Sequence, residues 1–84
     1  MPEAFIVTIA DSAGRFEADL EIPATLVFSS FEAKLLEILK MMDSRVFGGL
    51  RDYKLLFNNH AMSANDSLAS IGAFDGSRLV VLGR

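Results

Sequence analysis

Cysteine and tryptophan are absent from this chain of 84 residues, and histidine and tyrosine each occur once. Without cysteine, the chain has no disulfide, no thiolate zinc site and no cysteine nucleophile. The single histidine, His60, has no partner residues recognisable from spacing, so neither a Ser-His-Asp site nor a zinc site is indicated. We therefore interpret His60 as an exposed residue of a turn.

Other motifs of catalysis and cofactor binding are also missing. Gly48 and Gly49 form a double glycine, but the Lys-Ser or Lys-Thr pair of a phosphate-binding loop does not follow them. The sequence has no nucleophile elbow, no glycine-rich dinucleotide fingerprint and no paired acids that mark a pocket. We expect no catalytic, cofactor-binding or metal-binding residues, and we expect that the protein is not an enzyme.

Positive charge is scarce, with 8 lysines and arginines against 11 aspartates and glutamates. The basic residues are scattered singly along the chain, which argues against nucleic-acid binding. No apolar run approaches the ~18 residues of a membrane-spanning helix. Glu3 stands where a secretory signal would be basic. These features predict a cytoplasmic protein that is not inserted in a membrane.

The composition is that of a folded protein, because 51% of the residues are hydrophobic. A chain of this length has room for one core and no second lobe. We expect residues 1–84 to form a single domain.

The segment from Ser29 to Met42 is the one long amphipathic helix that the sequence predicts. Ser29 and Glu32 have the spacing of a capping box at its start. Leu36 is expected to point outward. The residues expected to face a sheet share a stripe at helical spacing, with Leu39 on its flank: Phe31, Leu35, Ile38 and Met42.

Two strands precede this helix. Residues 5–10 are rich in β-branched and aromatic residues, and residues 16–22 alternate apolar and acidic side chains. The turn residues from Asp11 to Gly14 join them into a hairpin that Pro23 ends. Glu17, Asp19 and Glu21 would lie on one open face; we interpret them as guards against sheet aggregation rather than as a cation site.

The remainder of the chain predicts short elements. Continuous apolar residues suit a central strand at residues 77–82, with Leu79 and Val81 toward the helix. The other elements expected are a loop at 43–52, a strand at 53–57, a turn at 58–60, a short strand at 61–62 and a helical turn at 68–71 that closes the core.

This order of elements resembles the ubiquitin-like β-grasp. The resemblance covers nearly the whole chain, and Lys54 to Phe57 and Ser67 to Leu82 run in step with the pattern of the superfamily. Two segments resemble the YukD/EsaB family, which is associated with bacterial type VII secretion. They are Asp19 to Ala24 and the closing set Leu68, Gly72, Gly76, Arg78, Leu79 and Leu82. The resemblance implies an α+β fold, with a mixed sheet of four to five strands in the order 2-1-5-3-4 packed on one main helix.

The resemblance also implies a function. Gly83 and Arg84 follow the last strand directly, without the flexible glycine-ended tail of conjugated modifiers. A non-enzymatic, non-conjugating protein that contacts secretion-machinery proteins is therefore expected. The alternatives are a covalent modifier and an adaptor domain of another pathway. Leu56, Val80 and Leu82 match the partner-binding face of ubiquitin-like domains, and strand alternation independently places them outward.

Overall fold

The computed structural model describes residues 4–83. The chain forms five strands and two helices in this part. In chain order they are β1 (Ala4–Asp11), β2 (Glu17–Pro23), α1 (Phe28–Met42), α2 (Ser44–Phe47), β3 (Tyr53–Phe57), β4 (His60–Ala61) and β5 (Arg78–Gly83).

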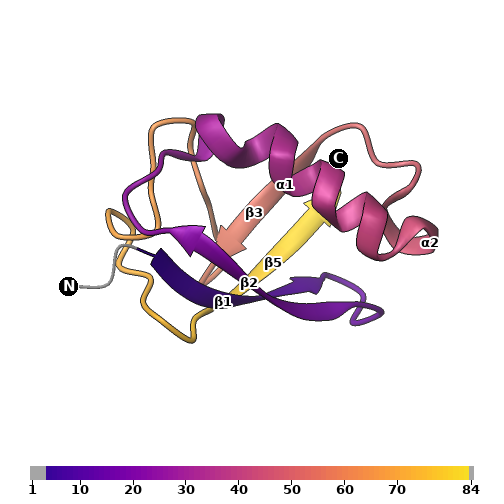
Figure 1. Ribbon diagram of the computed structural model, residues 1–84, viewed down its shortest axis with the longest axis horizontal. Coiled ribbons are helices and arrows are strands. Elements are labelled where there is room, and N and C mark those ends of the chain that lie inside the picture. The colour runs from indigo at the N-terminus through magenta and orange to yellow at the C-terminus, as the bar shows by residue number, and fades with distance from the viewer. Residues whose placement is uncertain (1–3, 84) are drawn as a thin grey trace.

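The strands form one mixed sheet in the order β2-β1-β5-β3-β4, and α1 lies across one face of it (Figure 1). β5 pairs in parallel with β1 and antiparallel with β3, while the two hairpins are antiparallel. The central place of β5 agrees with its continuous apolar sequence, because both of its edges are paired and one face lies under the helix. The structure confirms the ubiquitin-like β-grasp predicted from the sequence.

The core lies between α1 and the sheet. Leu79 and Val81 of β5 are fully buried, as predicted, together with Leu55 of β3. The buried residues of α1 are Phe28, Phe31, Leu35 and Leu39. The predicted stripe is therefore displaced toward Leu39, and Met42 remains 48% exposed. The prediction for Leu36 was also wrong, since this side chain is partly buried against the core.

The start of α1 differs from the predicted capping box. The helix begins at Phe28, so Ser29 lies inside the first turn, and the N-cap residue Val27 makes no side-chain hydrogen bond to the helix. Instead, the N–H of Phe28 donates to the carbonyl oxygen of Asp66 at 2.7 Å, and the N–H of Ser29 donates to that of Ala64 at 3.0 Å. A turn distant in the sequence thus satisfies amides that the first helical turn leaves unpaired.

The expected loop after α1 contains a short second helix, α2. The Asp43 carboxylate accepts hydrogen bonds from the N–H groups of Arg45 and Val46, at 3.1 and 3.2 Å. This cap starts the helix. The turn places Phe47 in the core, where its ring meets the ring of Phe16 edge to face at 5.0 Å.

The segment between β4 and β5 closes one end of the core. Leu68 is fully buried, as the predicted plug requires. The N–H of Ile71 donates to the carbonyl of Ser67 at 3.2 Å, but this single turn does not continue as a helix. Phe74, which lies further along this segment, is 61% exposed and does not close the core.

Candidate protein-binding surface

Leu56, Val80 and Leu82 lie on the face of the sheet that points away from α1. Their chain neighbours Leu55 and Val81 are fully buried on the inner face, and side chains alternate along a strand. The structure therefore places all three predicted residues on the same side of two adjacent strands, β3 and β5.

The register aligns these residues with small apolar neighbours. Leu56 is the partner of Val80 across the β3–β5 ladder, and Val80 is the partner of Ala10 on β1. Leu56 is also the partner of Ala61 on β4. Side chains directly opposite each other are in contact across a ladder. We name this set, together with Leu82, the outer apolar row.

Exposure increases along β5 within the outer apolar row. Leu56 and Val80 are half-buried by their neighbours, whereas Leu82 is 41% exposed. Leu82 lies opposite the exposed Lys54 of β3. The more exposed end of the row is thus bordered by a cationic side chain, which a partner could contact through an acidic group.

Polar groups border the other side of the row. Arg78 forms an ion pair with Glu17, and the Thr8 hydroxyl donates to a carboxylate oxygen of Asp19 at 2.8 Å. An apolar centre with a polar border is the usual make-up of a protein interface.

The acidic stripe of β2, formed by Glu17, Asp19 and Glu21, lies on the outer face as predicted. Asp19 and Glu17 interact with Thr8 and Arg78 respectively, which are groups of the sheet itself. Within residues 4–83, no group of three or more histidine, aspartate or glutamate side chains is arranged to hold a metal ion.

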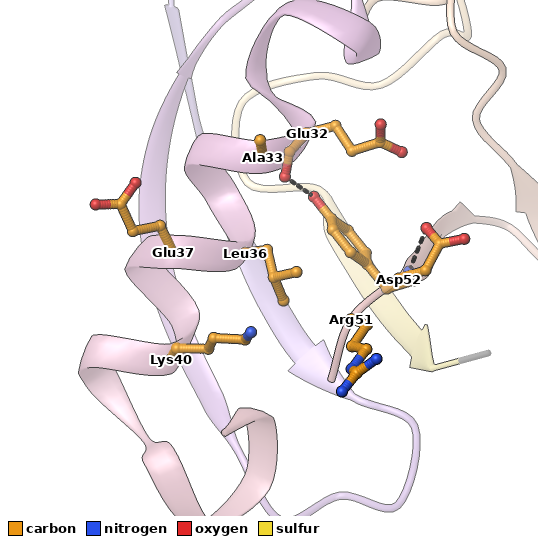
Figure 2. A pocket seen from close by; sticks show the side chains of 8 residues that line it. Glu32, Ala33, Leu36, Glu37, Lys40, Arg51 and Asp52 are labelled. Carbon is orange, nitrogen blue, oxygen red and sulfur yellow. Dashed lines mark hydrogen bonds between the residues drawn. The ribbon is translucent and has the colours of Figure 1, made fainter. Parts of the chain in front are cut away.

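A hollow lies between α1 and the start of β3, and no pattern in the sequence predicts it. It has a volume of about 320 Å³. Figure 2 shows Leu36 within it, with side chains of both charges around the apolar centre. The charged lining residues are Glu32, Glu37, Lys40, Arg51 and Asp52. Because α1 and the β3 segment are separate in the sequence, only their packing brings these residues together.

Tyr53 forms the wall of this hollow. Its hydroxyl donates to the backbone carbonyl oxygen of Glu32 at 2.7 Å (Figure 2). Burial raises the pKa of the Tyr53 phenol well above its ordinary value, and the negative charges of Glu32 and Asp52 add to this shift. The phenol therefore stays protonated even in alkaline solution above its ordinary pKa, and it acts as a structural donor that joins β3 to α1.

His60 is exposed at the start of β4, beside the turn at Asn58 and Asn59. The exposure predicted for His60 is confirmed, but its place in a turn was wrong, because the turn consists of Asn58 and Asn59 and His60 is the first residue of β4. Within residues 4–83, neither helix has both the length and the apolarity needed to cross a membrane.

The sequence matches no protein-family model and no curated protein. Its structure is nevertheless similar to several solved structures. The ubiquitin-like domain of the Mycobacterium tuberculosis type VII secretion system protein EccD1 is 22% identical with a TM-score of 0.74, covering 99% of this chain and 100% of that one. The ubiquitin of Caldiarchaeum subterraneum is 19% identical with a TM-score of 0.74, covering 96% and 94%.

A third similar chain belongs to a structure of the MycP5-free ESX-5 inner membrane complex. It is 21% identical with a TM-score of 0.79, and the match covers 99% of this chain. The match spans only 21% of that longer chain. At these identities, the three likenesses establish the shared ubiquitin-like fold.

Proposed function

We propose that this chain is a non-enzymatic, non-conjugating ubiquitin-like protein that acts by protein contact in a bacterial type VII secretion system. Its role is that of an accessory or regulatory component, as the resemblance to the YukD/EsaB family implies. The outer apolar row is the observation that carries this proposal. Its accessible part, in which Leu56 and Val80 are half-buried and Leu82 is 41% exposed, is a surface that a partner protein can cover.

The similar structures support the secretion context of this proposal. One is a domain of a type VII secretion protein, and another is a chain of an inner membrane complex. We propose that the present chain works at the cytoplasmic side of such a complex as a single ubiquitin-like domain. Its partners would be machinery proteins rather than nucleic acid, in keeping with its net charge of −3.

The main alternative is a covalent modifier, and the position of Gly83 speaks against it. Gly83 is the last residue of β5 and the ladder partner of Tyr53. A Cβ atom at this position would come within 2.7 Å of the Cδ1 atom of Leu50, so the glycine is closely packed. If Gly83 were the residue joined to a target, the end of β5 would have to unpair to present it. The second alternative, a ubiquitin-like adaptor of another pathway, would differ from the proposed protein in its partner.

The experiment that tests the proposal is affinity capture from the native cell, followed by mass spectrometry. Wild-type protein is compared with Leu82→Asp, which adds a charge to the outer apolar row. Met41→Asp is the matched control, because Met41 is an apolar residue of α1 that is 81% exposed and lies away from the row. Both variants should remain folded, which thermal unfolding verifies.

We expect secretion-machinery proteins to be recovered with wild type and Met41→Asp, and to be lost with Leu82→Asp. Equal recovery with the two folded variants would reject the outer apolar row as the contact surface. A partner set without any secretion component would assign the protein to another pathway. Intact-mass measurement of the captured protein separates the covalent alternative, because a modifier would appear as higher-mass adducts that Gly83→Ala abolishes.

A further inference from the structure

The hollow beside Tyr53 has two cationic side chains at one end. Lys40 reaches it from the last turn of α1, and Arg51 reaches it from the segment before β3 (Figure 2). Lys40 is half-buried. Within residues 4–83, neither side chain forms an ion pair or a side-chain hydrogen bond. A half-buried cation without a partner favours the approach of an anionic group, because burial removes part of its hydration.

The carboxylates that line the same hollow do not neutralise these two cations. Glu37 points away from Leu36 on one side of the hollow, and Glu32 points away on the other (Figure 2). The Asp52 carboxylate accepts a hydrogen bond from the N–H of Tyr53 at 2.9 Å. The cationic end of the hollow is therefore open to an acidic group that another molecule supplies.

An apolar contact point lies next to the cations. Leu36 precedes Lys40 by one helical turn, which separates the two residues by about 6 Å along the axis of α1. Leu36 is only half-buried, and Ala33, on the same side of the helix, is small and exposed. Ala33, Leu36 and Lys40 follow one another at spacings of three and four. Such spacing is typical of the side of a helix that packs against a second helix.

The lining of the hollow also indicates the form of its occupant. Five of the eight lining residues belong to α1, whose backbone groups bond within the helix. The N–H of Tyr53 is already bonded to Asp52. A partner therefore contacts the hollow through side chains and not through a strand ladder. In a helix, residues four positions apart lie about 5–6 Å apart on one face, which matches the separation of Leu36 and Lys40.

We propose that this hollow binds a helix of a partner protein in which an aspartate or glutamate lies four positions from a large apolar residue. The apolar side chain packs on Leu36 and Ala33, and the carboxylate pairs with Lys40 and Arg51. A second copy of α1 fits less well, because a two-fold axis beside Leu36 would bring two Glu37 carboxylates together. The hollow lies on the helix side of the sheet, so it is separate from the outer apolar row.

The probe for this proposal is a blocked, fluorescently labelled helical peptide of about sixteen residues, built on alanine and glutamine. It has a central leucine and a glutamate four positions after it. One control peptide has glutamine in place of the glutamate. The other has the glutamate two positions after the leucine, on the opposite side of the helix. We expect the probe to bind about fivefold more tightly than either control by fluorescence anisotropy. Amide NMR shifts should be largest at residues 33–40 and 51–53.

Matched variants locate the site. Lys40→Gln and Arg51→Gln should each weaken binding of the probe about threefold at low salt, because each removes one of the two cations. Lys34→Gln and Arg45→Gln make the same charge changes on exposed residues outside the hollow and should leave affinity unchanged. Thermal unfolding verifies that all four variants are folded.

Charge reversal at Lys40 tests the pairing directly. Lys40→Glu should lose affinity for the probe. It should bind a peptide with lysine in place of the glutamate about fivefold more tightly than wild-type protein does. A variant that only damaged the fold of α1 would lose affinity for both peptides.

Equal affinity for the glutamate and glutamine peptides would overturn the proposed charge recognition. Equal affinity for the peptide with the displaced glutamate would show that net charge alone attracts the probe, and would overturn the helix contact. Concentration-dependent dimers that Lys40→Gln separates, seen by sedimentation, would instead assign the hollow to a second copy. Leu82→Asp should leave peptide affinity unchanged, so failure of this proposal and failure of the proposed function are separable.

Discussion

Phe28 donates its backbone N–H to the carbonyl oxygen of Asp66 across 2.7 Å, and this bond joins the start of the main helix to a turn 38 positions later in the chain. The turn is itself held by the Asp66 carboxylate, which accepts from the N–H of Ser63 at 2.8 Å. The main helix is therefore capped by the tertiary structure.

We predict that Asp66→Ala lowers the free energy of unfolding by about 1 kcal/mol, because the turn that presents the capping carbonyls loses its side-chain bond. Ser29→Ala is the control, since no capping box forms, and it should change stability by less than about 0.5 kcal/mol. Urea unfolding measures both values. A larger loss of stability in Ser29→Ala than in Asp66→Ala would instead show that the Ser29 side chain caps the helix.

The phenol of Tyr53 should make stability depend on alkaline pH. Its pKa is raised in the folded state, so the folded protein holds this proton more tightly than the unfolded chain. Stability is then intact below the ordinary tyrosine pKa of about 10 and falls as pH rises above it. Tyr53→Phe should remove this part of the pH dependence.

Direct observation of this titration is possible because Tyr53 is the only tyrosine and the chain has no tryptophan. Ultraviolet absorbance should show phenolate only well above pH 10, together with unfolding. At neutral pH, Tyr53→Phe should cost about 1 kcal/mol for the lost bond to Glu32. Ionisation at the ordinary pKa in folded protein would contradict the buried position of the ring.

Truncation of two phenylalanines should destabilise the protein to very different extents. Phe47 is buried at 1% exposure, and we predict that Phe47→Ala costs about 3–5 kcal/mol through lost burial and a cavity. Phe74 is largely exposed, and Phe74→Ala should cost less than about 1 kcal/mol. Chemical denaturation compares the two. Similar losses would mean that Phe74 packs in the core.

The turn between β3 and β4 should tolerate one glycine well. Asn58 and Asn59 have positive φ angles of 51° and 66°, as a type I′ turn requires. Asn59→Gly removes the steric cost of this conformation and should stabilise the protein by a few tenths of a kcal/mol. Asn59→Val should destabilise it by about 1–2 kcal/mol, because a β-branched residue is strained there. Thermal unfolding distinguishes the signs.

Periodicity predicted the elements that bury a regular face. Alternation in β2 and the apolar run of β5 gave the strands and their inner residues correctly, and the outward position of Leu56, Val80 and Leu82 followed from the same rule. Helical spacing located α1 but assigned too much burial to Met42. The helical stripe specifies which residues of α1 could be buried, whereas the packing of the sheet against α1 decides how many of them are buried.

Packing between distant segments produced the features that periodicity missed. Asp43 and Phe47 form α2 within a stretch that has no repeat, because one cap and one buried ring suffice for a single turn. The hollow beside Tyr53 is lined by two separate segments, so no pattern in the linear chain predicts it.

By itself, the sequence determined the element order, the faces of the strands and the absence of thiol chemistry, because these depend on side-chain type and on the repeat of the local backbone. The tertiary structure alone decided the cap of α1, the outer apolar row as a continuous line across four strands, and the hollow beside Tyr53. Each of these depends on ladder register or on the meeting of distant segments, which local preference does not encode.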